Sequence, residues 1–370
     1  MKKTAKRISH FESSAIRKAF ALAGKIKNPI DLSIGQPDFN VPEIVKNAAI
    51  ESIKKDFNKY TPTNGILELR EKIAEELKKN GINVDPSEVL VTAGTTGAIF
   101  LVYLALLDPQ DEVIIFDPYF VAYKQLAELL GAKVKILDTY PDFQLNIKEL
   151  KKAISTKTKL IVLNSPNNPT GAVYEKEKIK EVAEIAQKND IYLLSDEVYE
   201  DFTYEGKHFS PGSIYKNTFT LNGFSKSISA TGWRIGYVAG PKDVIDKMAS
   251  LQQFIFVCAP SFAQHAAIKA LDYDNNKEVI GLKQKRDFLY ENLKDFYNIA
   301  KPAGAFYLFL KTPCEEEKFV DELLKHKVIV VPGSAFSDQK GYIRISYACS
   351  METLKRAVKV FQLLSQKYKS

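Results

Sequence analysis

One stretch decides the fold: KLIVLNSPNNPTG (159–171), followed by KEKIKEVAEIAQK (176–188) and IYLLSDEVY (191–199). The first and third parts open with short runs of Val, Ile and Leu that end in polar residues, which is typical of buried strands. The middle part places apolar residues at helical spacing among charged ones. Strand, helix and strand in this order predict parallel strands covered by a helix.

The same alternation continues from about residue 88 to residue 240. It predicts seven strands, at Val89–Ala93, Glu112–Phe116, Lys133–Leu137, Lys159–Leu163, Ile191–Ser195, Thr218–Asn222 and Ile235–Ala239. Helices are predicted between them, at Ala98–Leu107, Tyr119–Leu130 and Lys176–Lys188. The fold class is therefore α/β, with a mostly parallel seven-stranded sheet and helices on both faces.

A different pattern follows Pro241. Long helices are predicted first and strands afterwards, at about Val244–Phe256, Phe262–Leu271, Glu278–Phe296, Ala305–Leu310, Val328–Val331 and Tyr342–Tyr347, before a last helix. This order indicates a smaller α+β unit. We expect a large domain at 43–270, a small domain at 271–370, and a segment at 1–42 that is too short to fold alone and packs on the small domain.

Composition excludes several classes of protein. The chain of 370 residues is 45% hydrophobic, enough for a large core, and no stretch approaches the roughly 20 apolar residues of a membrane span. Residues 1–10 lack the apolar run of a secretory signal, so we expect a cytoplasmic location. The net charge of +7 comes from lysines interleaved with acidic residues, which indicates a solvated surface and no nucleic-acid partner.

The cysteines and histidines give no sign of a metal site. Three cysteines lie far apart and form no CxxC, and four histidines show neither HxxxH nor HExxH spacing. We expect no disulfide framework and no metal. The residues concerned are Cys258, Cys314, Cys349, His10, His208, His265 and His326.

Polar segments follow four of the predicted strands, and ligands gather at the carboxyl ends of such strands. After the first strand, the segment 93–97 (Ala-Gly-Thr-Thr-Gly) opens a helix, where free amides and two hydroxyls suit a phosphate; the alternative is a plain helix cap. The segment 164–171 contains two prolines that fix a loop able to aim an Asn amide, or it forms an ordinary Asn-Pro turn.

The other two segments carry ionisable groups. Asp196 ends an apolar strand as either a helix cap or a buried anion that needs a cation, and Tyr199 follows three residues later. Lys226 ends another strand among small residues, where a planar ring could approach an amine that forms a Schiff base; the alternative is a surface lysine. One edge of the sheet would thus carry an amine, an anion, an amide and a phosphate-binding segment. Pyridoxal 5'-phosphate (PLP) chemistry requires this set of groups.

At these residues the chain resembles the class I and II aminotransferases, the aspartate aminotransferase superfamily of fold-type I PLP enzymes. Motifs that match the family in order are SIGQPDF (33–39), Tyr60 before Gly65 and Glu68-Leu69-Arg70, NPTG (168–171), SDEVY (195–199), GFSK (223–226), GWRIG (232–236) and RISY (344–347). The resemblance spans nearly the whole chain.

The resemblance implies a role for each matching residue. Lys226 would form the imine with the cofactor and then act as general base and acid, and Asp196 would pair with the pyridinium nitrogen. Tyr199 and Asn168 would bind the phenolic oxygen of the ring, and Phe120 would stack on its face. The phosphate ligands would be Thr95, Thr96 and Arg234, joined by Tyr60 from the partner subunit of a homodimer. Gly94 and Ser225 would also contact the cofactor, and Ser225 would partly replace the phosphate-binding serine that some members carry at position 223. Arg344 would clamp the substrate α-carboxylate with Gly35 and Asn168.

Two positions depart from the family pattern and bear on the substrate. Gly223 stands where some members carry a phosphate-binding serine, and Thr96 stands where aspartate-specific prokaryotic members often carry a lysine for the distal carboxylate. The segments 14–18 and 254–256 instead resemble members that accept aromatic or other bulky amino acids. Arg17 could meet a distal carboxylate, or it lies at the surface or between subunits.

The sequence thus predicts a PLP-dependent aminotransferase that moves an amino group from an L-amino acid, aromatic, aspartate or similar, to a 2-oxo acid such as 2-oxoglutarate by a ping-pong mechanism. A C–S β-lyase on the same fold is the alternative, because the same carbanion expels a leaving group at Cβ. A third hypothesis is a regulator that senses PLP without turnover. Such a protein would need a DNA-binding module, and we do not favour this hypothesis because the enzyme-like core accounts for the 370 residues.

Overall fold

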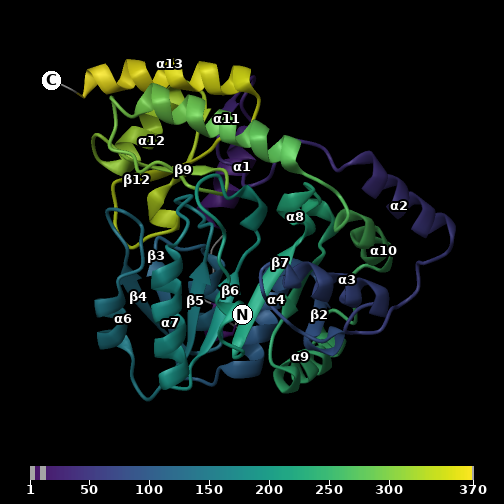
Figure 1. Ribbon diagram of the computed structural model, residues 1–370. Coiled ribbons are helices and arrows are strands. Elements are labelled where there is room, and N and C mark those ends of the chain that lie inside the picture. Colours follow the sequence, from purple (N-terminus) through teal and green to yellow (C-terminus); the bar gives the residue numbers. More distant parts are fainter. Residues whose placement is uncertain (1–4, 9–13, 369–370) are drawn as a thin grey trace.

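The computed structural model describes residues 5–8 and 14–368 (Figure 1). Its largest element is a seven-stranded sheet in the order β2-β8-β7-β6-β5-β3-β4, in which only β8 runs antiparallel to its neighbours. The strands are β2 (Val89–Thr92), β3 (Glu112–Asp117), β4 (Lys133–Asp138), β5 (Thr158–Asn164), β6 (Tyr192–Asp196), β7 (Thr218–Gly223) and β8 (Gly236–Ala239). The predicted fold class is confirmed.

Helices cover both faces of this sheet because alternate strand residues point to opposite sides. Val113 and Ile115 pack with α4 (Gly94–Leu106), α5 (Ala122–Leu129) and α9 (Lys242–Ile255), whereas Ile114 packs with α6 (Ile147–Ala153) and α7 (Lys176–Lys188). Further along that second face, Val89 and Val91 pack with α2 (Glu43–Lys54), α3 (Leu67–Lys78) and α10 (Ser261–Ala270).

A smaller unit lies against one end of the sheet, with its long helices outermost (Figure 1). Its elements are α11 (Asn276–Leu293), β9 (Tyr307–Lys311), α12 (Glu316–Lys325), β10 (Val328–Ile329), β11 (Val331–Pro332), β12 (Tyr342–Ser346) and α13 (Met351–Lys367). Because α9 and α10 pack on the large sheet unit, we propose that the two units divide near residue 270.

The single predicted strand at Val328–Val331 is wrong. It splits at Val330 into β10, which pairs with β1 (Ile30–Asp31), and β11, which pairs with β12 in a three-stranded sheet. The amino-terminal segment thus adds a strand to the small unit, and α1 (Ala15–Ala23) packs beside β11. Among the described residues, no helix is both long and apolar enough to cross a membrane.

Candidate active site

A cavity of about 710 Å³ opens at the carboxyl ends of the large-sheet strands. It is lined by every predicted site residue except Gly94 and Tyr60: Gly35, Thr95, Thr96, Phe120, Asn168, Asp196, Tyr199, Ser225, Lys226, Arg234 and Arg344. Gly94 lies directly beneath the lining, against the guanidinium of Arg234. Tyr60 is 83% exposed and takes no part in the cavity of its own chain.

Lys226 lies on the short helix α8 (Phe224–Ser227), which starts where β7 ends. The residue is half-buried and lines the cavity, and its Nζ atom donates a hydrogen bond to the carbonyl of Gly35 at 2.5 Å. Burial lowers the pKa of Lys226 to about 8, and the nearby charges of Arg344 and Arg234 act in the same direction. The side chain can therefore supply a neutral, nucleophilic amine at far lower pH than an exposed lysine.

Asp196 ends β6, the strand next to β7, and its side chain is buried. Its carboxylate accepts hydrogen bonds from the hydroxyl of Tyr123 at 2.7 Å and the amide of Val198 at 3.3 Å. Burial raises the pKa of Asp196 to about 6 despite these bonds, because no ion pair with another described residue offsets the loss of water. The site thus presents a buried anion that a cationic group would stabilise.

Close backbone contacts form a cradle beside Arg234. Gly94 has a φ of +74°, and a Cβ there would lie 2.5 Å from the Arg234 guanidinium; a Cβ on Gly236 would lie 2.9 Å from the Thr95 amide nitrogen. The expected start of the helix at Ala98 is wrong, because α4 begins at Gly94. Thr95 and Thr96 therefore occupy the first helical turn, where unpaired amides favour an anion.

Arg344 projects from β12 and is 1% exposed. Its guanidinium donates to the Asn168 side-chain oxygen at 3.0 Å and to the Ser33 carbonyl at 2.6 Å. Its central carbon lies 4.5 Å from the centroid of the Tyr307 ring and 4.7 Å from that of the Phe336 ring. The two hydrogen bonds and the two ring contacts restrict the movement of the guanidinium, which favours bidentate binding of a carboxylate.

A model of the family "Aminotransferase class I and II" matches residues 27–361 of this chain. The chain belongs to the class I and II aminotransferases. It is 39% identical to a probable aspartate aminotransferase of Methanocaldococcus jannaschii over 96% of this chain and 98% of the relative. It is 40% identical to the aromatic-amino-acid aminotransferase 2 of Thermococcus litoralis, covering 95% of each. A solved structure of a Thermus thermophilus aspartate aminotransferase mutant complexed with tryptophan superposes with a TM-score of 0.95 at 38% identity, covering 98% of this chain and 100% of that chain.

This membership makes the protein a PLP-dependent aminotransferase, as the sequence predicted. The residues present fit the cofactor. The amine of Lys226 suits its aldehyde, and the buried Asp196 anion, which forms no ion pair within the described residues, suits its pyridinium nitrogen. The glycine-lined helix start beside Arg234 suits its phosphate.

Three residues of the cavity wall, Tyr123, Asn164 and Tyr307, were not predicted as site residues from the sequence. Tyr123 lies three positions after Phe120, one turn along the chain, and this helical spacing could have identified it. Asn164 belongs to the loop already singled out; its amide donates to the Asp196 carbonyl at 3.0 Å and its oxygen accepts the Asn168 amide at 2.9 Å. Tyr307, whose hydroxyl lies 2.8 Å from that of Tyr199, gave no signal because β9 lies 108 residues further along the chain.

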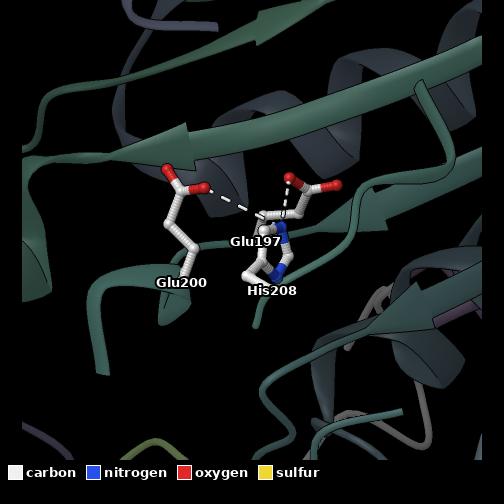
Figure 2. A group of neighbouring side chains, drawn as sticks. All are labelled: Glu197, Glu200 and His208. Atoms are coloured by element: carbon white, nitrogen blue, oxygen red, sulfur yellow. Dashed lines mark hydrogen bonds and ion pairs between the residues drawn. The ribbon is translucent and has the colours of Figure 1, made fainter. Parts of the chain in front are cut away.

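A cluster of three ionisable side chains lies outside the cavity wall, on the segments that follow β6 (Figure 2). Nε2 of His208 lies 2.9 Å from Glu197 and 3.8 Å from Glu200, and the three ligand atoms lie within 4.8 Å of one another. The carboxylates already accept hydrogen bonds from the side chains of Ser195, Ser210, Asn80 and Asn222. Ion pairing and hydrogen bonding account for this arrangement, and we propose no metal here.

Proposed function

We propose that this aminotransferase takes the amino group of an L-amino acid, aromatic or acidic, and delivers it to a 2-oxo acid such as 2-oxoglutarate in two successive half-reactions. One observation carries the proposal: the amine of Lys226 and the buried anion of Asp196 line the same cavity from neighbouring strand ends. The relatives' names, which include both aspartate and aromatic aminotransferases, support the two donor classes. They also favour transfer over the elimination alternative.

Lys226 and Asp196 would do the acid–base work. When bound, PLP supplies an aldehyde for the substrate amine and a ring that accepts negative charge from the substrate Cα. Asp196 would hold a negative charge against the ring nitrogen and thereby keep that nitrogen protonated. Lys226 Nζ, with its lowered pKa, would take the proton from the substrate Cα and deliver it to the former aldehyde carbon of the cofactor, on the other side of the substrate nitrogen.

The remaining side chains would orient the reactants. Tyr199 and Asn168 face the cavity where the ring oxygen would lie, and Phe120 forms the wall on one side. The phosphate would lie in the cradle formed by Gly94, Thr95, Thr96, Ser225 and Arg234. Arg344 would bind the α-carboxylate together with Asn168 and the backbone of Gly35.

The active unit would be a homodimer that works in the cytoplasm. Exposed apolar side chains gather on the large unit, including Phe254, which is 87% exposed, and its neighbours Ile255, Phe256 and Val257. The Phe256 ring borders Gly97 in the first turns of α4, so a second copy that covers this patch would lie next to the phosphate cradle. The second copy could then place its Tyr60 beside the cradle. Within its own chain Tyr60 is exposed and does not line the cavity.

Single amino acids mixed with the holoenzyme test this function. Without any acceptor, an aminotransferase releases one oxo acid per active site and then stops; we expect this with Asp, Glu, Phe or Tyr. Adding 2-oxoglutarate should restore continuous turnover. Steady release of pyruvate and ammonia from cystathionine without an acceptor would instead establish the lyase.

A further inference from the structure

The amino-terminal helix α1 supplies part of the cavity wall. Ala19 and Ala23 are buried against the small unit in a cluster that includes Phe309, Val331 and Phe336, and this packing fixes the position of the helix. The first turn of α1 and the residue before it also border the cavity, which Ser14, Ile16 and Arg17 line. Arg17 is thus held at the cavity rim by the helix that carries it.

Among the described residues that line the cavity, Arg17 is the cation to which no group of the cofactor or substrate has yet been assigned. Within residues 5–8 and 14–368, the cationic side chains that line the cavity are those of Arg17, Lys226, Arg234 and Arg344, and the acidic one is that of Asp196. Lys226 is assigned to the cofactor aldehyde, Arg234 to the phosphate and Arg344 to the α-carboxylate. The Arg17 side chain forms no hydrogen bond or ion pair with any residue at 5–8 or 14–368, and it is exposed.

Aliphatic side chains form part of the cavity wall. Ile16, Ile34 and Val121 line the same cavity, and Thr96 at the phosphate side carries no charge. A substrate held at its α-carboxylate by Arg344 would therefore run its side chain along aliphatic groups toward the rim. An acidic side chain would meet a guanidinium there, whereas an aromatic one would need the apolar contacts alone.

We propose that Arg17 determines specificity by binding the side-chain carboxylate of dicarboxylic amino and oxo acids, an inference that rests on the proposed function. A guanidinium offers two parallel N–H donors to a carboxylate. Because Arg17 is exposed, it remains hydrated when an aromatic substrate occupies the cavity. One site can thus serve both donor classes.

Binding of unreactive acids to the holoenzyme tests this role. Succinate and butyrate share a four-carbon chain and differ in the second carboxylate, so their dissociation constants by calorimetry isolate that group. We expect Arg17→Met to weaken succinate about tenfold, the size of a hydrogen bond to a charged group, and to leave butyrate within about twofold. Lys25→Met is the matched control, because it removes an exposed positive charge just after α1 and outside the cavity lining.

Kinetics supply the second readout. Arg17→Met should raise KM for glutamate and 2-oxoglutarate while leaving kcat/KM for phenylalanine unchanged, and Arg17→Lys should restore part of the succinate affinity. Equal succinate affinity in the wild-type and Arg17→Met enzymes would overturn the inference and leave the proposed function intact. A holoenzyme that binds neither acid would instead count against the α-carboxylate site at Arg344, and thus against the proposed function itself.

Discussion

The hydroxyl of Tyr123 helps Asp196 keep its negative charge in a buried site, because it donates the shorter of the two hydrogen bonds to that carboxylate. Tyr123→Phe removes this donor and should raise the pKa of Asp196 further. We expect cofactor binding to weaken by about 1.5 kcal/mol or more, the size of a hydrogen bond to a charged group. Titration of the apoprotein with PLP measures this change.

Tyr103→Phe is the matched control for this substitution. The Tyr103 hydroxyl is also buried near Asp196, but it has no hydrogen-bond partner within the described part of the chain. Its removal should leave cofactor affinity unchanged. Equal affinity in Tyr123→Phe and wild type would show that Asp196 does not depend on this bond.

The site residues that could be predicted from the sequence lie at or just after the ends of predicted strands. Asp196 ends an apolar strand with a charge and Lys226 follows another by three residues, and a buried charge at such a place requires a partner. Tyr123 and Tyr307 are aromatic residues in apolar surroundings, and their hydroxyl contacts depend on which elements meet in space. No spacing along the chain specifies the second of these contacts.

At the scale of elements, the Glu197–His208–Glu200 cluster ties the segment after β6 to the end of β7, because Glu200 also accepts a hydrogen bond from Asn222. Burial alone would lower the pKa of His208, but Glu197 and Glu200 raise it above its ordinary value. The charged imidazole therefore stabilises the fold below its ordinary pKa of 6.5, and this stability is lost as pH rises through the raised pKa.

His208→Gln should accordingly destabilise the protein by about 3 kcal/mol at pH 6, since it leaves the buried carboxylate of Glu197 without its cation, and by less at pH 9. Calorimetric unfolding at the two pH values measures the difference. His326→Gln, at an exposed position after α12, should change neither value. A His208→Gln effect that grew with pH would contradict the charged imidazole.

The hydrophobic pattern predicted the elements of the large sheet within one or two residues, because buried parallel strands are continuous apolar runs. The pattern gave the wrong strand where the choice of pairing partner determines how a segment is divided into strands. Residues 328–331 form one apolar run, yet β10 pairs with the distant β1 and β11 pairs with β12. The start of α4 was also missed, since Gly and Thr are weak helix formers and the turn is held by the cradle around Arg234.

At the scale of the whole molecule, the proposed dimer should complete each active site. Lys226→Ala and Tyr60→Ala chains each lack one group, but a hybrid dimer of the two contains one site with both groups intact. We expect mixed and co-refolded chains to recover activity that neither variant shows alone. Activity that stays at the sum of the separate variants would mean that Tyr60 does not act across subunits.

The central claim is that Lys226 alone among the lysines holds the cofactor covalently. Borohydride reduction of the holoenzyme, followed by peptide mapping by mass spectrometry, tests it most directly. We predict the reduced cofactor on the peptide that contains Lys226, and none on any peptide of Lys226→Ala. Cofactor attached to a different lysine in the wild-type chain, or released entirely unattached, would contradict the account.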